Sequence, residues 1–298
     1  MSPPSHEPSR SLALLSLLVP RACGPVSTRI QVAIERSIAL GLFPEGLLPS
    51  ERQLAATLDV SRTALRAALD LVRESGYAER SLVGRAGGVP IGAGRPLTAG
   101  EIEQAASRAL DEIGELAAVR TFLEPVCARR MASADERTRE RQLAPLVESQ
   151  ERLAAAPSPM AHRMTDGEFH YGLAVVSGSD EIIGTLLRAR ADLLRWRDRL
   201  PMQDTVWHSV TEHVAIIDAI RRGDADDAEA ATLAHLRSSQ ELYTLFLQRY
   251  VDEPEIVLAE GEAAVSRPTE PRADGPVAPT ARSAPTAPTA PTQRTSSS

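Results

Sequence analysis

Apolar side chains recur every three or four residues along most of this chain, the spacing that places them on one face of an α-helix. In the first third of the chain, this pattern predicts helices at 26–42, 51–58 and 62–75. Longer amphipathic segments follow without a strong strand pattern. They predict helices at 101–131, 135–156, 161–176, 181–200, 206–221 and 225–250. We therefore expect a mainly α-helical protein whose six later helices form an antiparallel bundle with an interior pocket.

Segments rich in glycine and proline divide these helices into regions. Residues 77–91 contain Gly84, Gly87 and Gly88, and they predict a two-stranded wing after the third helix. Residues 92–100, GAGRPLTAG, have the composition of a hinge. We expect five regions: a poorly ordered arm at 1–24, a winged helix-turn-helix domain at 25–91, the hinge at 92–100, an all-α bundle at 101–250, and a disordered Pro/Ala/Thr-rich tail at 251–298.

The arm contains one apolar run, LALLSLLV at Leu12–Val19, which is much shorter than the ~20 residues needed to span a bilayer. Only Arg10 precedes the run and the residues after it are a poor cleavage match, so a secretory signal peptide is disfavoured. A short helix that packs on a neighbouring element or subunit is the preferred interpretation. Cys23 and Cys127 are far apart in the sequence, which is typical of a reducing compartment. We expect a cytoplasmic protein with no membrane partner.

The net charge of the chain is −7, which is unusual for a DNA-binding protein until the charge is divided by region. Residues 21–100 carry 10 Arg and 7 acidic side chains, whereas residues 101–250 carry 18 Arg and 25 acidic side chains. The positive charge therefore lies where the winged helix-turn-helix is expected. We expect only that domain to contact DNA.

The helix predicted at 62–75 has the features of a DNA-recognition helix. Ser61 can cap its N-terminus, and Arg62, Thr63 and Arg66 lie near its start. The N-terminal amides and guanidinium groups of such a helix can contact phosphates and guanine edges in a major groove. The segment Leu48–Arg80 therefore predicts binding to double-stranded DNA.

This region resembles the winged helix-turn-helix of the GntR family of bacterial transcription regulators. The matching residues are Leu48–Arg52 (LPSER), Leu54-Ala55, Val60–Thr63, Leu65-Arg66, Ala68-Leu69 and Gly76. The resemblance implies phosphate contacts from the Ser and Thr hydroxyls and minor-groove contacts from the wing. The DNA-binding residues that it implies are Ser50, Arg52, Ser61, Arg62, Thr63, Arg66, Arg85 and Gly87.

Two features of the DNA-binding region leave room for other interpretations. Asp59 stands where the family usually has a turn glycine, and Asp tolerates a left-handed backbone better than most residues. Arg52 and Arg66 can alternatively form surface ion pairs with Glu51 and Asp70, which usually contribute little energy.

The predicted bundle contains a possible set of metal ligands. Asp166 and His170 are four residues apart and share one helix face. His213 and His235 lie among apolar residues on two later helices. One carboxylate and three imidazoles from three helices can bind a divalent ion and leave positions open for a ligand or water. The alternative is a polar pocket without a metal, because a histidine on an apolar face is most often a core residue.

The same segment resembles the effector domain, called FCD, of the FadR subfamily of GntR regulators. The matching residues are Arg120, Leu123-Glu124, Asp166, Phe169-His170, Ser177-Gly178, Glu212-His213, Ile217, Ala219-Ile220, Asp224 and His235. The resemblance implies that Asp166, His170, His213 and His235 hold a divalent metal. The expected ion is Zn, with Ni or Mn as alternatives, because imidazole-rich mixed sites discriminate poorly between metals.

Arg120 is the candidate effector-binding residue. Its guanidinium can bind the carboxylate of a small acid beside the metal. Alternatively, Arg120 pairs with Glu124 one helical turn later. His162, next to the Pro-rich break, is expected to be exposed to solvent.

These features predict a ligand-responsive transcription regulator rather than an enzyme, and by resemblance a repressor. A homodimer would place two recognition helices ~34 Å apart on a palindromic operator. A small carboxylate effector at the metal site would shift the bundle helices, pull on the hinge and change the separation of the two wings. Two alternatives are a metal-dependent hydrolase-like enzyme with an accessory DNA-binding domain, and a regulator with a purely structural metal.

Overall fold

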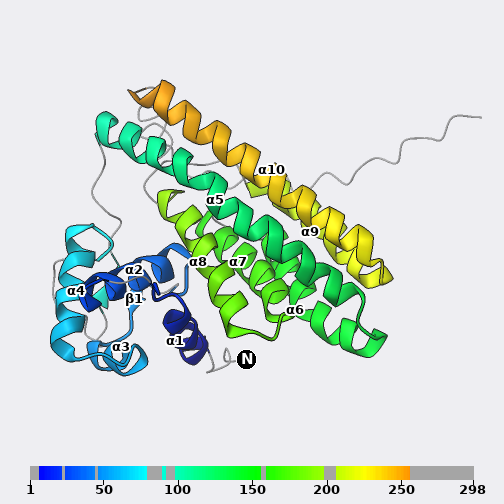
Figure 1. Cartoon of the computed structure of the whole chain (residues 1–298), viewed down its shortest axis with the longest axis horizontal. Coiled ribbons are helices and arrows are strands. Elements are labelled where there is room, and N and C mark those ends of the chain that lie inside the picture. The colour runs from blue at the N-terminus through cyan, green and yellow to red at the C-terminus, as the bar shows by residue number, and fades with distance from the viewer. Residues whose placement is uncertain are drawn as a thin grey trace, which may run out of the picture.

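A computed structural model describes residues 7–21, 24–43, 46–78, 89–91, 98–155, 159–197 and 206–255. The described residues form helices and one two-stranded sheet, which confirms the mainly α-helical class (Figure 1). The elements are α1 (Glu7–Leu17), α2 (Val26–Ala39), β1 (Leu47–Leu48), α3 (Glu51–Thr57), α4 (Arg62–Glu74), β2 (Val89–Pro90), α5 (Ala99–Ala132), α6 (Glu136–Ala154), α7 (Pro159–Val175), α8 (Asp180–Arg197), α9 (Val206–Arg222) and α10 (Ala225–Asp252). Among these helices, none is long and apolar enough to cross a membrane.

Local sequence signals fix where several helices begin. The Ser50 hydroxyl accepts a hydrogen bond from the Gln53 backbone amide, and the Ser50 backbone amide donates to Gln53 Oε1, which forms a capping box at the start of α3. Thr98 and Glu101 form the same motif at the start of α5. Ser61 caps α4 through the Ala64 amide. Each cap satisfies an amide that would otherwise lack a partner in the first helical turn.

The turn between α3 and α4 depends on a left-handed residue. Asp59 has a φ of 50°, and it is the one non-glycine residue of the described chain with a positive φ. The Val60 amide donates to the Ala55 carbonyl across this turn. An aspartate at this position therefore performs the conformational role that a glycine has elsewhere in the family.

The end of the predicted wing pairs with a strand that precedes α3. β1 pairs antiparallel with β2, with Leu47 opposite Pro90 and Leu48 opposite Val89. An additional bridge joins Ala78 to Ile91. Residues 79–88, and with them Arg85 and Gly87, lie outside the described residues, so the predicted wing contacts stay predictions.

The second half of the chain is a bundle in which α5 and α10 pack along each other (Figure 1). One buried cluster includes Met131 of α5, Leu146 of α6, Phe169 of α7 and Ile216 of α9. A second cluster joins the N-terminal half of α5 to the C-terminal half of α10. The helices that carry the predicted metal ligands are therefore held by a continuous apolar interior.

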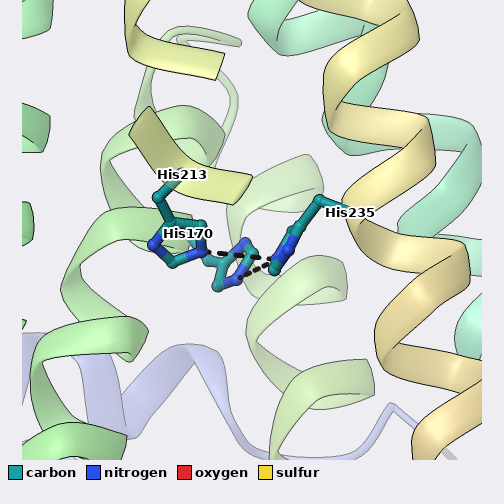
Figure 2. A group of neighbouring side chains, drawn as sticks. All are labelled: His170, His213 and His235. Atoms are coloured by element: carbon teal, nitrogen blue, oxygen red, sulfur yellow. Dashed lines mark hydrogen bonds between the residues drawn. The ribbon is translucent and has the colours of Figure 1, made fainter. Parts of the chain in front are cut away.

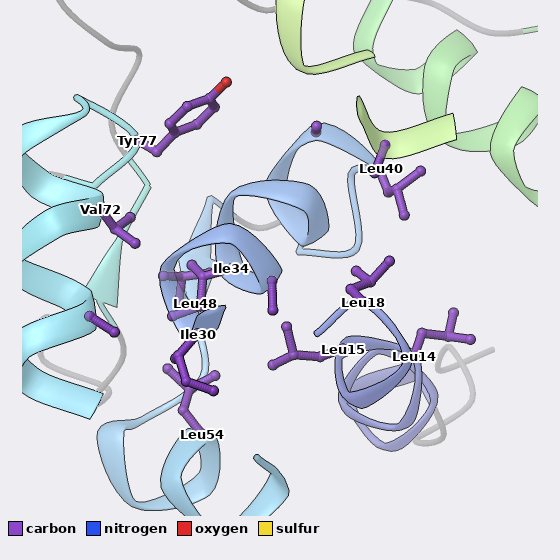
Figure 3. Packing of buried hydrophobic residues seen from close by; sticks show 14 of the residues in the cluster. Leu14, Leu15, Leu18, Ile30, Ile34, Leu40, Leu48, Leu54, Val72 and Tyr77 are labelled. Atoms are coloured by element: carbon purple, nitrogen blue, oxygen red, sulfur yellow. The ribbon is translucent and has the colours of Figure 1, made fainter. Parts of the chain in front are cut away.

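The N-terminal arm differs from the poor order expected for residues 1–24. Residues 7–17 form α1, and Leu14, Leu15 and Leu18 are buried (Figure 3). These leucines belong to the same cluster as Ile30 of α2. The physical reason is the burial of apolar surface, because three closely spaced leucines pack against α2, α3 and α8. The expectation of disorder is corrected for this part of the arm, and the alternative of a short packing helix agrees with the structure.

Candidate metal centre and DNA-binding surface

Three histidines from three helices meet in the interior of the bundle. His170 of α7, His213 of α9 and His235 of α10 are 4%, 0% and 2% exposed. The Nε2 atom of His235 lies 3.3 Å from the Nε2 atoms of both His170 and His213 (Figure 2). One ligand atom from each residue falls within 4.8 Å of the others. The three rings therefore converge on a small common volume, as the sequence predicted.

Asp166 lies at the edge of the same volume. Its Oδ1 atom is 3.6 Å from His213 Nε2 and 3.9 Å from His170 Nε2. Its Oδ2 atom accepts a hydrogen bond from Arg190 of α8. All four predicted ligands therefore gather at one place, with one oxygen of Asp166 directed toward the histidines.

Each histidine is oriented by an acceptor at its Nδ1 atom. Nδ1 of His170 lies 2.6 Å from Glu124 Oε2. Nδ1 of His235 lies 2.8 Å from Glu212 Oε2. Because an ionised carboxylate can only accept, the Nδ1 atoms of these two rings carry the proton. Their Nε2 atoms therefore carry lone pairs at the common volume, and Arg120 Nη2, a donor, lies 3.4 Å from that of His170.

His213 follows the same arrangement with a neutral partner. Its Nδ1 atom lies 3.2 Å from Gln150 Oε1, while Gln150 Nε2 donates to the Val210 carbonyl at 2.6 Å. The amide nitrogen is thus occupied, and the oxygen faces the ring. Three buried Nε2 lone pairs then face one another and repel. A divalent cation bound between them removes this repulsion, and metal-binding histidines commonly have their Nδ1 atoms hydrogen-bonded in this way. The donor set therefore fits a divalent metal.

The charges of the site suit a cation as well. Burial raises the pKa of Asp166, but Arg190 and then the three histidines outweigh burial and hold this pKa well below its usual range. Burial lowers the pKa of His170 to about 4, even though Glu124 opposes the shift. Burial likewise lowers the pKa of His213 well below its usual value. An ionised Asp166 and two neutral imidazoles at pH 7 are the protonation states that bind metals.

Arg120 is close to the site, but it is already paired. Its Nε atom lies 2.6 Å from Glu124 Oε1, and both side chains are buried. The structure therefore contains the ion pair that sequence reasoning left as the alternative role for Arg120. Arg120 and then His170 offset the burial of Glu124 and lower its pKa below the usual value. Arg120 also lines the cavity beside the histidines, so a role in effector binding stays a prediction.

A small cavity of about 40 Å³ lies beside the histidines. Its polar lining includes Asp166, Arg190, Glu212 and the hydroxyls of Ser209, Ser238 and Ser239, and its apolar lining includes Leu193, Leu194, Leu242 and Tyr243. His162 also lines the cavity and is 3% exposed, so the expectation that it faces solvent is wrong. The cavity borders three of the proposed metal ligands, Asp166, His170 and His235.

Sequence reasoning missed the outer partners of the site. Glu212 neighbours His213 in sequence, yet its carboxylate serves His235 on the next helix. Glu124 was visible in the family pattern as a partner of Arg120, not of His170. Gln150 and Arg190 carried no local signal, because only the packing of α6 and α8 on α7 and α9 brings them to the site.

Six of the predicted DNA-contacting residues lie on α3 and α4 or at the N-caps of these helices. Arg52, Arg62, Thr63 and the capping Ser61 are exposed, and Ser50 is half-buried. Arg66 is 66% exposed and its Nε atom lies 3.0 Å from Glu51 Oε2, a surface ion pair of the kind weighed as the alternative, whereas Asp70 pairs with Arg73. An exposed pair of this kind is weak, so phosphate can compete for the guanidinium.

Two family comparisons agree with this architecture. The sequence model described as "Bacterial regulatory proteins, gntR family" matches residues 27–85. The FCD domain model matches residues 115–238. This chain belongs to the GntR family of bacterial transcription regulators. It is a DNA-binding regulator and not an enzyme, which sets aside the hydrolase-like alternative.

Relatives of known function cover most of this GntR-family chain. The HTH-type transcriptional repressor NanR of Cronobacter sakazakii is 29% identical over 231 residues, which is 74% of this chain and 85% of the relative. NanR of Escherichia coli (strain K12) is 29% identical over 246 residues, which is 77% and 88% of the two chains. A solved GntR transcriptional regulator from Rhodococcus sp. RHA1 is 22% identical, with 73% of this chain and 96% of that chain covered and a TM-score of 0.41.

Proposed function

We propose that this regulator is a repressor that binds a palindromic operator as a homodimer. A small carboxylate effector, bound beside a divalent metal in the FCD bundle, releases or resets it. The repressor assignment is supported by the two NanR relatives, which carry that name. In this proposal the DNA-binding domain spans residues 25–91, the segment 92–100 links it to the FCD bundle, and the bundle spans residues 101–250.

The single observation that carries the metal proposal is the orientation of the histidines. Their three Nε2 lone pairs converge beside an ionised Asp166, while Glu124, Gln150 and Glu212 occupy the Nδ1 atoms. A divalent ion, with Zn as the first candidate and Ni or Mn as alternatives, would be held by Asp166, His170, His213 and His235. When bound, it supplies a Lewis-acidic point for the carboxylate of an effector.

The chain's own residues supply the rest of the effector site. Arg190 fixes Asp166, and the Arg120–Glu124 pair fixes the orientation of His170. Serine hydroxyls and the two arginines give the cavity its hydrogen-bond donors. The combination favours a small polar acid over an apolar ligand.

The homodimer is supported by an unpartnered apolar strip on α5. Phe122 and Val126, one helical turn apart, are 74% and 52% exposed. Large exposed apolar side chains on one helix face commonly mark a protein–protein interface. Light scattering on the purified chain measures its mass directly, and a monomer at micromolar concentration would contradict the dimer.

The central experiment combines metal analysis with DNA binding. The purified chain is analysed for bound metal, and a duplex selected in vitro by the full-length protein is titrated with and without small carboxylic acids. We expect one divalent ion per chain and a lower DNA affinity with the correct acid. A protein that ignores duplex DNA at low salt refutes the regulator proposal. A metal whose removal unfolds the bundle while no acid changes DNA affinity indicates a purely structural ion.

A further inference from the structure

Helix α8 contacts both the metal-ligand set and the DNA-binding domain. Arg190 pairs with Asp166, one of the proposed ligands, and Asp192 pairs with Arg36 of α2. These two α8 residues are about 3 Å apart along the helix axis and about 200° apart around it. A single turn of α8 therefore contacts both halves of the protein.

The pair between Asp192 and Arg36 is a two-point contact at the domain boundary. Arg36 Nε lies 2.8 Å from Asp192 Oδ1, and Arg36 Nη2 lies 2.6 Å from Oδ2. The side chains are only 12% and 14% exposed. Arg36 Nη1 also donates to the Leu18 carbonyl at 2.9 Å. Because both charges are largely removed from water, the loss of one partner leaves the other uncompensated.

Helix α1 fills the space between α8 and the DNA-binding domain. Leu15 and Leu18 are fully buried there (Figure 3). They belong to one apolar cluster with Leu187 and Ala191 of α8. Arg188 Nη1 donates to the carbonyl of Leu17 at 2.8 Å. The hinge at 92–100 is therefore not the sole connection between the two domains: a packed apolar core crosses the boundary as well.

A second close approach lies beside the site on α7. Gly41, which has a φ of 69° after the end of α2, lies so near α7 that a Cβ there would be 2.5 Å from Met164 Cγ. Met164 precedes Asp166 by two residues. On α8, Leu194 lines the cavity beside the histidines and also belongs to the cluster that contains α1 and α2. Packed side chains therefore connect the metal-ligand set to the DNA-binding domain, so a displacement of α7 or α8 at the site also displaces residues of that domain.

We propose that α8 transmits the state of the metal and effector site to the DNA-binding domain, with the Arg36–Asp192 pair and α1 as the coupling contacts. When Asp166 changes partners, Arg190 moves, and α8 carries the displacement as a rigid element to Asp192 and Arg36. The direction of coupling follows from differential affinity: a ligand favours the orientation of α8 in which it binds more tightly. The role of the site in this inference rests on the proposed function.

The test is hydrogen–deuterium exchange on the full-length chain, with Zn²⁺ alone as the probe. In the unsubstituted chain we expect Zn²⁺ to change amide exchange in α7 and α8 and, by about fivefold or more, in α1 and α2. In Asp192→Asn, the change should persist in α7 and α8 but be lost in α1 and α2. Zinc binding by calorimetry should persist in Asp192→Asn, because Asp192 does not touch the site, and the affinity should change by no more than the lost coupling, about fivefold. The matched control is Asp218→Asn, which removes an exposed pair with Arg221 on α9.

Three results would overturn the inference. A response confined to the bundle of the unsubstituted chain refutes the coupling and leaves the proposed metal site intact. A response of α1 and α2 in Asp192→Asn that equals the original refutes the role of the pair. If Asp192→Asn does not fold, Asp192→Glu is used instead, because it keeps the charge but loses the two-point geometry. The response of α1 and α2 to zinc should then be reduced. A full response refutes the role of the Arg36–Asp192 pair in the coupling.

An absence of zinc uptake would instead refute the proposed metal site. The coupling is then measured without metal by comparison of Arg190→Gln with the unsubstituted chain. Faster exchange in α2 supports transmission through α8, because the ion pair of Arg190 is with Asp166 of α7. Unchanged exchange in α2 overturns it.

Discussion

The orientation of His235 by Glu212 gives the sharpest quantitative prediction about the site. Glu212 Oε2 lies 2.8 Å from His235 Nδ1, and the glutamate side chain is 29% exposed. Glu212→Ala removes this acceptor, frees the imidazole to rotate or to change tautomer, and removes one negative charge beside the proposed cation. The global fold should tolerate the change, because the carboxylate is partly hydrated.

The magnitude follows from the energy of one charge-assisted hydrogen bond. Such a bond contributes about 1.5–3 kcal/mol, and each 1.4 kcal/mol corresponds to about tenfold in an equilibrium constant. Since solvent screens a part of this energy, the lower half of that range applies here. We expect zinc affinity to fall by about 10-fold to 40-fold in Glu212→Ala, within the range of effects for other outer partners of metal-bound histidines.

The assay is competition for Zn²⁺ against a chromophoric chelator. Glu168→Ala is the matched control. Like Glu212, Glu168 is close in sequence to proposed ligands, since it lies two residues from both Asp166 and His170, but it pairs with Arg152 on the surface. Glu168→Ala should bind zinc as the unsubstituted chain does. The reasoning is refuted if Glu212→Ala retains full zinc affinity, or if Glu168→Ala loses as much.

Three further predictions concern the DNA-binding surface and the buried interior. Arg62→Ala should weaken duplex binding by about 1–3 kcal/mol and lower the salt dependence by about one ion if its contact is a phosphate; fluorescence anisotropy across a salt series measures both, and an unchanged affinity contradicts the contact. Glu124→Gln should lower the free energy of unfolding in urea by about 3–5 kcal/mol, because it leaves the buried Arg120 charge without its carboxylate; a change below about 1 kcal/mol would contradict this. Leu15→Ala should cost about 2–5 kcal/mol in the same assay if α1 is part of the core, whereas Leu245→Ala, at an exposed position, should cost little.

Much of the local structure was determined by the sequence itself. Apolar periodicity located the helices, and Ser61 marked the start of α4. Asp59 was identified as the left-handed turn residue, and its φ is 50°. The four-residue spacing placed Asp166 and His170 on one face. These features depend on interactions within a few residues, so the local sequence is sufficient to predict them.

The tertiary structure decided which side chains face one another across helices. It brought Gln150 to His213, directed Glu212 to His235 instead of to a neighbour in sequence, and placed Glu124 of α5 against His170 of α7. It also placed α1 against α8, although its short leucine run was compatible with several locations. The physical reason is that these contacts depend on the rotation and register of packed helices. Dense interior packing, summed over the whole chain, sets both quantities, and no local segment encodes them.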